Sequence, residues 1–206
     1  MQVLLISPGH DIVNHYLRAW SKKLYQTTKN NTEYIILDGG DANRSRLESV
    51  LKKRRVDVVL LNGHGAGDKL AGINDEVILD LNNVDLLRDK KVHALSCQTA
   101  RVLGPSAMRA GAKCYIGYDE DFAIVTSRDK ISHPTEDATA ALFLDPAFAA
   151  PRALLKGKTA SEAVEIAINE YDKSIAKALN SDVQSADDQF VKYLIGDRDH
   201  LQSCAK

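Results

Sequence analysis

The sequence predicts an α/β protein in which a mostly parallel, six-stranded sheet has helices on both faces. Three observations lead to this class. Short runs rich in Val, Ile, Leu and Tyr alternate with stretches of helical period, which is typical of a parallel sheet with crossover helices. The runs are apolar at consecutive positions, as in strands that are buried on both faces. The length of 206 residues fits one domain, which we expect to span residues 1–206.

Five apolar runs are predicted as parallel strands, at residues 3–7, 34–37, 56–62, 92–96 and 113–117. Apolar side chains recur at helical spacing after the first run and after the second, which predicts one crossover helix in each place. The long connection between the third and fourth runs contains a short extended piece at residues 76–79 and one or two helical turns at residues 83–88.

The rest of the chain is predicted to be mainly helical. Residues 105–110 form a short helix that Gly111 can end in a left-handed conformation, and residues 126–134 are a polar loop. Further helices are expected at residues 136–144 and after a capping box that begins at Thr159. An apolar run at residues 190–195 is predicted as the sixth strand.

Composition narrows the classes of partner and the location. Lys and Arg number 27 against 28 Asp and Glu, so the chain has no electrostatic footprint for nucleic acid or for an anionic membrane. The N-terminal apolar run stops at Pro8, too early for a signal peptide or a membrane span. The chain has three cysteines, an odd number, and they lack the regular spacing of a disulfide-rich protein, which fits a reducing compartment. We therefore expect a cytoplasmic protein.

Two residues that follow predicted strands carry the strongest chemical signal. Ligands of open α/β sheets bind beyond the carboxyl ends of the strands, and His64 and Cys97 each follow such an end. If their strands are neighbours, His64 can remove the proton of the Cys97 thiol or hold the thiolate as an ion pair. The flanking glycines allow close approach of a substrate, and the amides of Gly65 and Cys97 could hold an oxyanion.

Ordinary structural roles compete with this interpretation. A lone cysteine at the end of a buried strand is most often a small core residue, and a lone histidine in a glycine-rich turn is most often on the surface. The pairing of His64 with Cys97 at two strand ends favours the functional interpretation. Cys114 is expected in the core and Cys204 in the tail.

No metal or cofactor is predicted. Zinc-ligand spacing with a cysteine is absent for three further histidines, His10, His15 and His93. The glycine-rich segment 63–67 lacks the Lys-Ser/Thr of a P-loop and does not fit a dinucleotide fingerprint, so it is a weak phosphate site.

The order of these motifs resembles the caspase-like cysteine peptidases, and most closely their CHAT and separase branch. The matching motifs, within residues 56–171, are Asn62-Gly63-His64-Gly65, the segments 94–100 and 107–112, Asp137-Ala138-Thr139-Ala140-Ala141 and the segment 157–163. The resemblance implies a three-layer caspase-like fold and a cysteine endopeptidase that forms an acyl-enzyme on Cys97. The caspase signature Gln-Ala-Cys-Arg-Gly is absent, so cleavage after Asp is not expected.

The resemblance also implies that the exits of the first and fifth strands build the specificity pocket. Those exits hold Asp11 and the acidic cluster Asp119, Glu120 and Asp121. We expect Asp121 to be the main contact for a basic residue before the scissile bond, with Asp11 and Asp119 in support. A solvated turn is the alternative explanation of such a charge run.

Two other function classes remain open. A catalytically inactive caspase-like module could bind a protein in the same cleft, and a small-molecule hydrolase or phosphate-binding protein has only the glycine-rich turn in its favour. The expected partners are a protein substrate, which could be encoded beside this chain, and a regulatory protein. The oligomeric state is not predicted.

Overall fold

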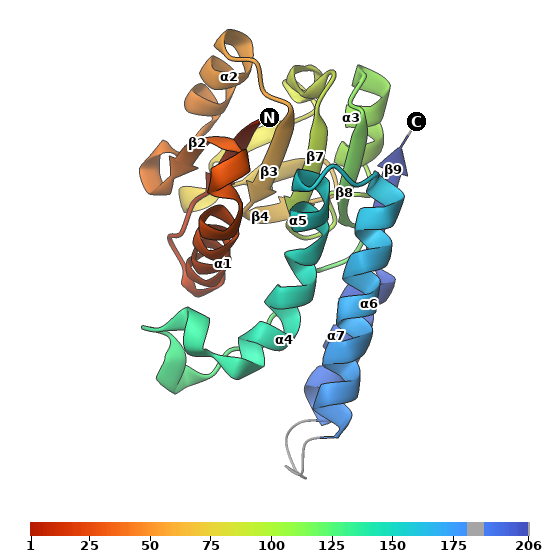
Figure 1. Cartoon of the computed structure of the whole chain (residues 1–206). Coiled ribbons are helices and arrows are strands. Elements are labelled where there is room, and N and C mark those ends of the chain that lie inside the picture. Colours follow the sequence, from red (N-terminus) through yellow and green to blue (C-terminus); the bar gives the residue numbers. More distant parts are fainter. Residues whose placement is uncertain (181–187, 206) are drawn as a thin grey trace.

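A six-stranded sheet forms the centre of the molecule in a computed structural model that describes residues 1–180 and 188–205 (Figure 1). The strand order is β2-β1-β3-β7-β8-β9. The first five of these strands pair in parallel, and β9 runs antiparallel to β8. Their bounds are β1 Gln2–Ser7, β2 Glu33–Asp38, β3 Val58–Asn62, β7 Lys91–Leu95, β8 Cys114–Tyr118 and β9 Leu201–Ala205. The predicted fold class is therefore confirmed.

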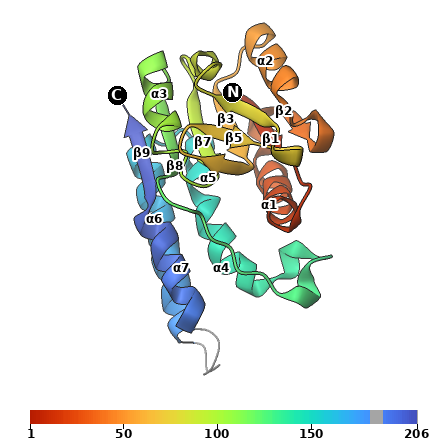
Figure 2. The ribbon, with the colours of Figure 1, turned by 180° about the vertical axis from the view of Figure 1, so that it is seen from behind.

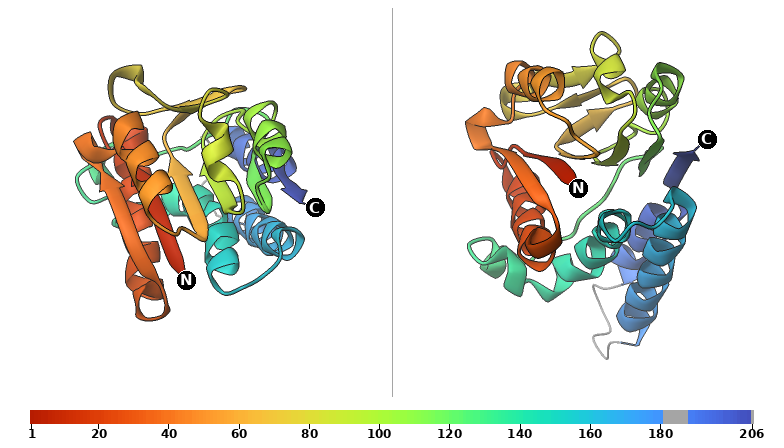
Figure 3. Two further views of the ribbon diagram at one scale, coloured as in Figure 1. Left: turned by 90° about the horizontal axis from the view of Figure 1, so that it is seen from above. Right: turned by 45° about the horizontal axis from the view of Figure 1, so that its top comes forward.

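The sheet and the elements that cover its two faces form three layers (Figure 3). One hydrophobic core fills the space on each face of the sheet. Consecutive strand residues point to opposite faces, so Val3 and Leu5 belong to one core and Leu4 and Ile6 to the other. The first core is covered by α1 Ile12–Thr28, α4 Ala138–Ala147, α5 Ala149–Leu155, α6 Ala160–Leu179 and α7 Asp188–Asp199. The second is covered by α2 Arg44–Lys53, α3 Leu103–Ala110 and a small antiparallel sheet of β4 His64–Ala66, β5 Lys69–Ala71 and β6 Val77–Asp80.

Short 3-10 helices join several of these elements. They are η1 Lys29–Asn31, η2 Gly39–Asp41, η3 Ile73–Asp75, η4 Val84–Leu87, η5 Arg128–Lys130 and η6 Pro134–Glu136. No helix in the described ranges, 1–180 and 188–205, combines the length and apolar character needed to cross a membrane.

The sixth strand is not where the sequence predicts it. Residues 190–195, predicted as a strand, lie in α7, and the sixth strand is β9. Val191 and Leu194 face the core whereas Tyr193 and Ile195 are exposed, which is a helical period rather than an alternating one. The other five predicted strands, the capping box at Thr159 and the left-handed end of α3 are confirmed.

Two cysteines lie in the neighbouring strands β8 and β9. Cys114, expected in the core, is buried in β8. Cys204, expected in the tail, is part of β9 and packs against the second core. Both are free thiols, and so is Cys97.

The chain between β8 and α4 crosses from one side of the molecule to the other (Figure 2). Asp137 anchors the far end of this crossing segment, because its buried carboxylate accepts hydrogen bonds from the Tyr16 hydroxyl (2.7 Å) and the Ser127 amide (2.7 Å). The same carboxylate caps α4 by accepting from the Thr139 and Ala140 amides. The predicted loop at residues 126–134 is thus tied to α1 and α4.

Candidate active site

Strand pairing places His64 and Cys97 at equal heights beyond the sheet. The strands β3 and β7 are neighbours, and Asn62 is paired with Leu95. His64 lies two residues beyond Asn62, and Cys97 lies two residues beyond Leu95. The predicted neighbourhood of the two strands is confirmed, so both residues emerge side by side at the carboxyl edge of the sheet.

A backbone contact fixes the two segments that follow these strands. A Cβ atom on Gly65 would lie 2.1 Å from the Cys97 carbonyl oxygen and 2.8 Å from the Cys97 nitrogen, so only glycine fits there. Farther along, the Gly67 carbonyl accepts hydrogen bonds from the amides of Val102 (3.2 Å) and Leu103 (2.8 Å). Residues 63–67, expected as a glycine-rich turn, therefore form β4 and then run against the start of α3.

Asp11 holds the His64 ring. Its Oδ2 lies 2.6 Å from His64 Nε2, and its Oδ1 caps α1 by accepting from the Asn14 amide at 2.8 Å. Partial burial opposes ionisation of Asp11, but the hydrogen bonds from Asn14 and His64 outweigh it and lower the pKa to about 2. An ionised Asp11 accepts the Nε2 proton of His64, which leaves His64 Nδ1 as the proton acceptor.

This contact gives Asp11 a position that the sequence did not indicate. Asp11 is expected to support the specificity pocket, and in the structure its carboxylate contacts His64, His10 and Asn14. The polar strand exit drew attention to Asp11, but its contact with His64, 53 residues away along the chain, has no sequence signal.

Cys97 is half-buried and carries a poorly acidic thiol. Its Sγ lies 3.8 Å from the Phe122 carbonyl oxygen, to which it can donate. Burial raises the pKa of the Cys97 thiol, and the nearby Asp121 carboxylate raises it further. The next residue, Gln98, has a left-handed backbone (φ 58°), a strained conformation that a side chain rarely adopts and that is concentrated at functional sites. A tight turn thus presents a protonated thiol.

Two of the three carboxylates in the acidic cluster after β8 contact basic side chains of the same chain. Asp119 binds His200 at 2.8 Å, and Glu120 pairs with Arg101. Asp121 accepts a hydrogen bond from the Gln98 side chain at 2.8 Å and has no cationic partner among residues 1–180 and 188–205. Of the three carboxylates, Asp121 is therefore the one that a basic ligand could pair with.

A buried carboxyl lies behind this exit and was missed by sequence reasoning. Asp197 of α7 is 1% exposed, its Oδ1 accepts from the Ala123 amide at 2.9 Å, and its Oδ2 has no partner in the described part of the chain. Burial raises the pKa of Asp197 well above its usual range. Asp197 fixes the residue next to Phe122, whose carbonyl faces the Cys97 thiol.

Three side chains at the base of the site have the chemistry of metal ligands. His10, Asp11 and His64 each offer one ligand atom, and these atoms lie within 4.8 Å of one another. The spacing of histidines and cysteines predicts no metal site, whereas this group includes a carboxylate and no cysteine. Cys97 is not a member of it.

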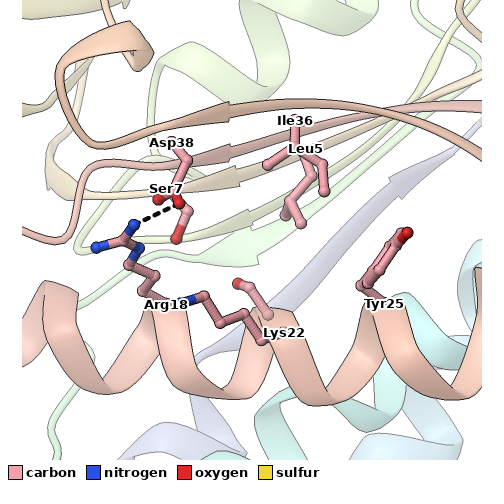
Figure 4. Close-up of a pocket in the computed structure, with 8 residues that line it drawn as sticks. Leu5, Ser7, Arg18, Lys22, Tyr25, Ile36 and Asp38 are labelled. Carbon is pink, nitrogen blue, oxygen red and sulfur yellow. Dashed lines mark hydrogen bonds and ion pairs between the residues drawn. The ribbon is translucent and has the colours of Figure 1, made fainter.

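A small pocket lies between α1 and the strands β1 and β2 (Figure 4). Its polar end is formed by Ser7, Arg18 and Asp38, with an ion pair between the last two. Arg18 also packs under Gly9, where a Cβ atom would lie 2.7 Å from Arg18 Cδ and where φ is 70°. Arg18 therefore limits how the segment between β1 and α1, which carries His10 and Asp11, can fold.

We predict that Gly65→Ala separates the two segments of the site. The added methyl group meets backbone rather than a flexible side chain, so we expect the free energy of unfolding to fall by roughly 1–3 kcal/mol in urea denaturation. Gly40→Ala is the matched control, because nothing lies within 4 Å of a Cβ atom there. Equal stability of the two variants would refute the close contact.

We predict that Asp197→Asn becomes more stable relative to the wild type as pH rises from about 4 to 7. The folded wild type holds the Asp197 proton more tightly than the unfolded chain does, so the wild type loses stability over this range, by at most about 1.4 kcal/mol per pH unit. Urea denaturation at several pH values measures the difference, with exposed Asp85→Asn as control. Parallel pH curves for Asp197→Asn and the wild type would contradict the burial of an unpaired carboxyl.

Comparison with known proteins identifies the fold. No family model and no curated protein matches the sequence. Among solved structures, the Arg-specific cysteine proteinase gingipain R is similar, with a TM-score of 0.52 and 11% sequence identity. The match covers 84% of this chain and 43% of gingipain R, so this chain spans less than half of the protein it resembles. The fold is the caspase-like α/β fold, and the assignment to the CHAT and separase branch stays a prediction.

Proposed function

We propose that the protein is a cysteine endopeptidase in which Cys97 is the nucleophile and His64 is the general base. The observation that carries this proposal is the placement of both residues at one height beyond the paired strands β3 and β7. The backbone at Gly65 also packs against the backbone of Cys97, which brings the two chain segments together. The fold shared with a cysteine proteinase adds support.

The reaction follows from the hydrogen bond that Asp11 makes. With the Nε2 proton directed at Asp11, His64 Nδ1 takes the thiol proton as Cys97 Sγ attacks the substrate carbonyl carbon. The amides of Gly65 and Cys97 donate to the resulting oxyanion. His64 then returns the proton to the leaving amine, and a water molecule deprotonated by His64 hydrolyses the acyl-enzyme. Asp11 acts in these steps as a positioning residue.

A Cys–His pair can react either as a preformed thiolate–imidazolium pair or by proton transfer during the attack, and the raised pKa of the Cys97 thiol favours the second route. Burial raises the thiol pKa, so a preformed thiolate–imidazolium pair is disfavoured in the free protein. Proton transfer to His64 therefore accompanies the attack on the carbonyl. A substrate that approaches with a positive charge would ease this transfer, since the Asp121 carboxylate is part of what opposes ionisation of the thiol.

The same charge supports cleavage after a basic residue. Asp121 lacks a cationic partner among the described residues, and Arg offers a bidentate, charge-assisted contact to a carboxylate. Asp119, bound by His200, is a weaker candidate for this contact. We further propose that the substrate is a protein, which could be encoded beside this chain, that a regulatory protein controls the activity, and that the three free thiols belong to a reducing, cytoplasmic setting.

A second candidate is a catalytically inactive module that binds a protein with the same cleft. The raised pKa of the half-buried Cys97 thiol favours it, because a low-pKa thiolate is the usual mark of a reactive cysteine. Hydrolysis by the purified protein decides between the two.

We predict that Cys97→Ala and His64→Ala each abolish peptide hydrolysis and leave the far-ultraviolet circular dichroism unchanged. The double variant should lose no more than either single variant, since the two residues act as one unit. Cys204→Ala, which changes a half-buried thiol in β9, is the control and should keep its activity. Hydrolysis by Cys97→Ala protein would refute the mechanism.

We predict that Asp121→Ala lowers kcat/KM for a peptide with Arg before the scissile bond by roughly 10- to 150-fold. This range corresponds to the loss of a charged hydrogen bond of about 1.5–3 kcal/mol. Asp85→Ala, at an exposed position in η4, serves as control. A peptide-library profile dominated by acidic or aliphatic residues before the cut would contradict this specificity, even with the role of Cys97 intact.

A further inference from the structure

We propose that His10, Asp11 and His64 form a binding site for Zn²⁺, and that bound Zn²⁺ switches the peptidase off. The inhibition rests on the proposed function, whereas the binding of the ion does not. Both histidines approach the same oxygen, with Asp11 Oδ2 lying 2.6 Å from His64 Nε2 and 3.2 Å from His10 Nε2. The two nitrogen atoms and the carboxylate thus converge on one point.

The distances are close to those of a zinc site. Zinc bonds to nitrogen and oxygen measure about 2.0–2.2 Å, so neighbouring ligand atoms in a tetrahedron are about 3.4 Å apart. The contact between His10 and Asp11 is already near this value, and that between His64 and Asp11 needs to lengthen by less than about 1 Å. The two rings meet edge to face, with centroids 5.7 Å apart, and the Nε2 atom of each already lies beside Asp11 Oδ2.

The donor set and its surroundings suit a reversibly bound Zn²⁺. Two imidazoles and one carboxylate are a ligand combination that zinc accepts with a fourth position left for water. The His64 and Asp11 side chains are 44% and 35% exposed, so an ion can enter from solvent. Asp11 is held by both the amide and the side chain of Asn14, and Gly9 rests on Arg18, so the segment carrying two of the ligands is fixed in advance.

Bound zinc would inhibit by moving a proton within one ring. A neutral imidazole carries one N–H, and Asp11 keeps it on Nε2 of His64 when no ion is bound. Zinc takes the Nε2 lone pair, so the proton moves to Nδ1. A protonated Nδ1 cannot accept the proton of Cys97. Inhibition therefore needs no bond between zinc and the thiol, in keeping with the absence of Cys97 from the ligand group.

Isothermal titration calorimetry of the full chain, stripped of metal with a chelator and titrated with Zn²⁺, tests the site directly. We expect one ion per chain and a loss of affinity of at least about 10-fold in His10→Ala. His133→Ala, which removes an exposed histidine elsewhere, and Cys97→Ser should bind as the wild type does. Equal zinc binding by His10→Ala and the wild type would overturn the proposal. It would also be overturned if the wild type bound no zinc at a Zn²⁺ concentration of about 1 mM, which is the weak end of specific affinities. Loss of binding in Cys97→Ser would overturn the ligand assignment.

A second measurement tests the inhibition. Peptide hydrolysis with and without Zn²⁺ is compared within each variant, so that changes in basal activity cancel. Zinc should inhibit the wild type and His133→Ala, whereas His10→Ala should need at least about 10-fold more zinc for the same inhibition. Zinc binding without hydrolysis by any variant would refute the proposed function and leave the metal site standing. Hydrolysis that zinc inhibits equally in the wild type and His10→Ala would refute the regulatory role.

Discussion

The packing of Gly65 against the Cys97 backbone is the constraint on which the candidate site depends. Parallel pairing of β3 with β7 brings His64 and Cys97 to one height, but only the absence of a side chain at residue 65 lets the two segments meet. The same contact sets the positions of the two amides proposed as oxyanion donors. The proposed base, nucleophile and oxyanion donors therefore share one geometric origin, which is the register of two neighbouring strands.

The electrostatic surroundings of His64 differ from those of Cys97. Asp11 lies on the His64 side, where its ionised carboxylate fixes the orientation and tautomer of the His64 ring. On the other side, burial and Asp121 keep the Cys97 thiol protonated. In the proposed mechanism Cys97 is therefore an unreactive thiol until His64 acts on it, and His64 Nε2 is the atom at which a cation could interrupt the reaction.

Much of the fold and the two central residues could be predicted from the sequence, for identifiable reasons. Buried parallel strands are continuous apolar runs, and the residues after them mark the ligand-binding edge, which singled out His64 and Cys97. The strand β9 was not predicted from the sequence, because Leu201–Ala205 is a short edge strand in which only Leu201 is buried. The contacts of Asp11 and Asp197 could not be foreseen, because each joins its partner across a turn or helix whose path depends on packing.

The most direct test of the central claim is to map the adduct formed by a peptidyl chloromethyl ketone that ends in arginine. Such a reagent binds as a substrate and alkylates the nucleophile that the base activates. Intact-protein and peptide mass spectrometry should find one adduct per chain on Cys97, none on Cys114 or Cys204, and little in His64→Ala protein. An adduct spread over the three thiols, or formed at the same rate on Cys97 without His64, would contradict a site in which the two residues work together.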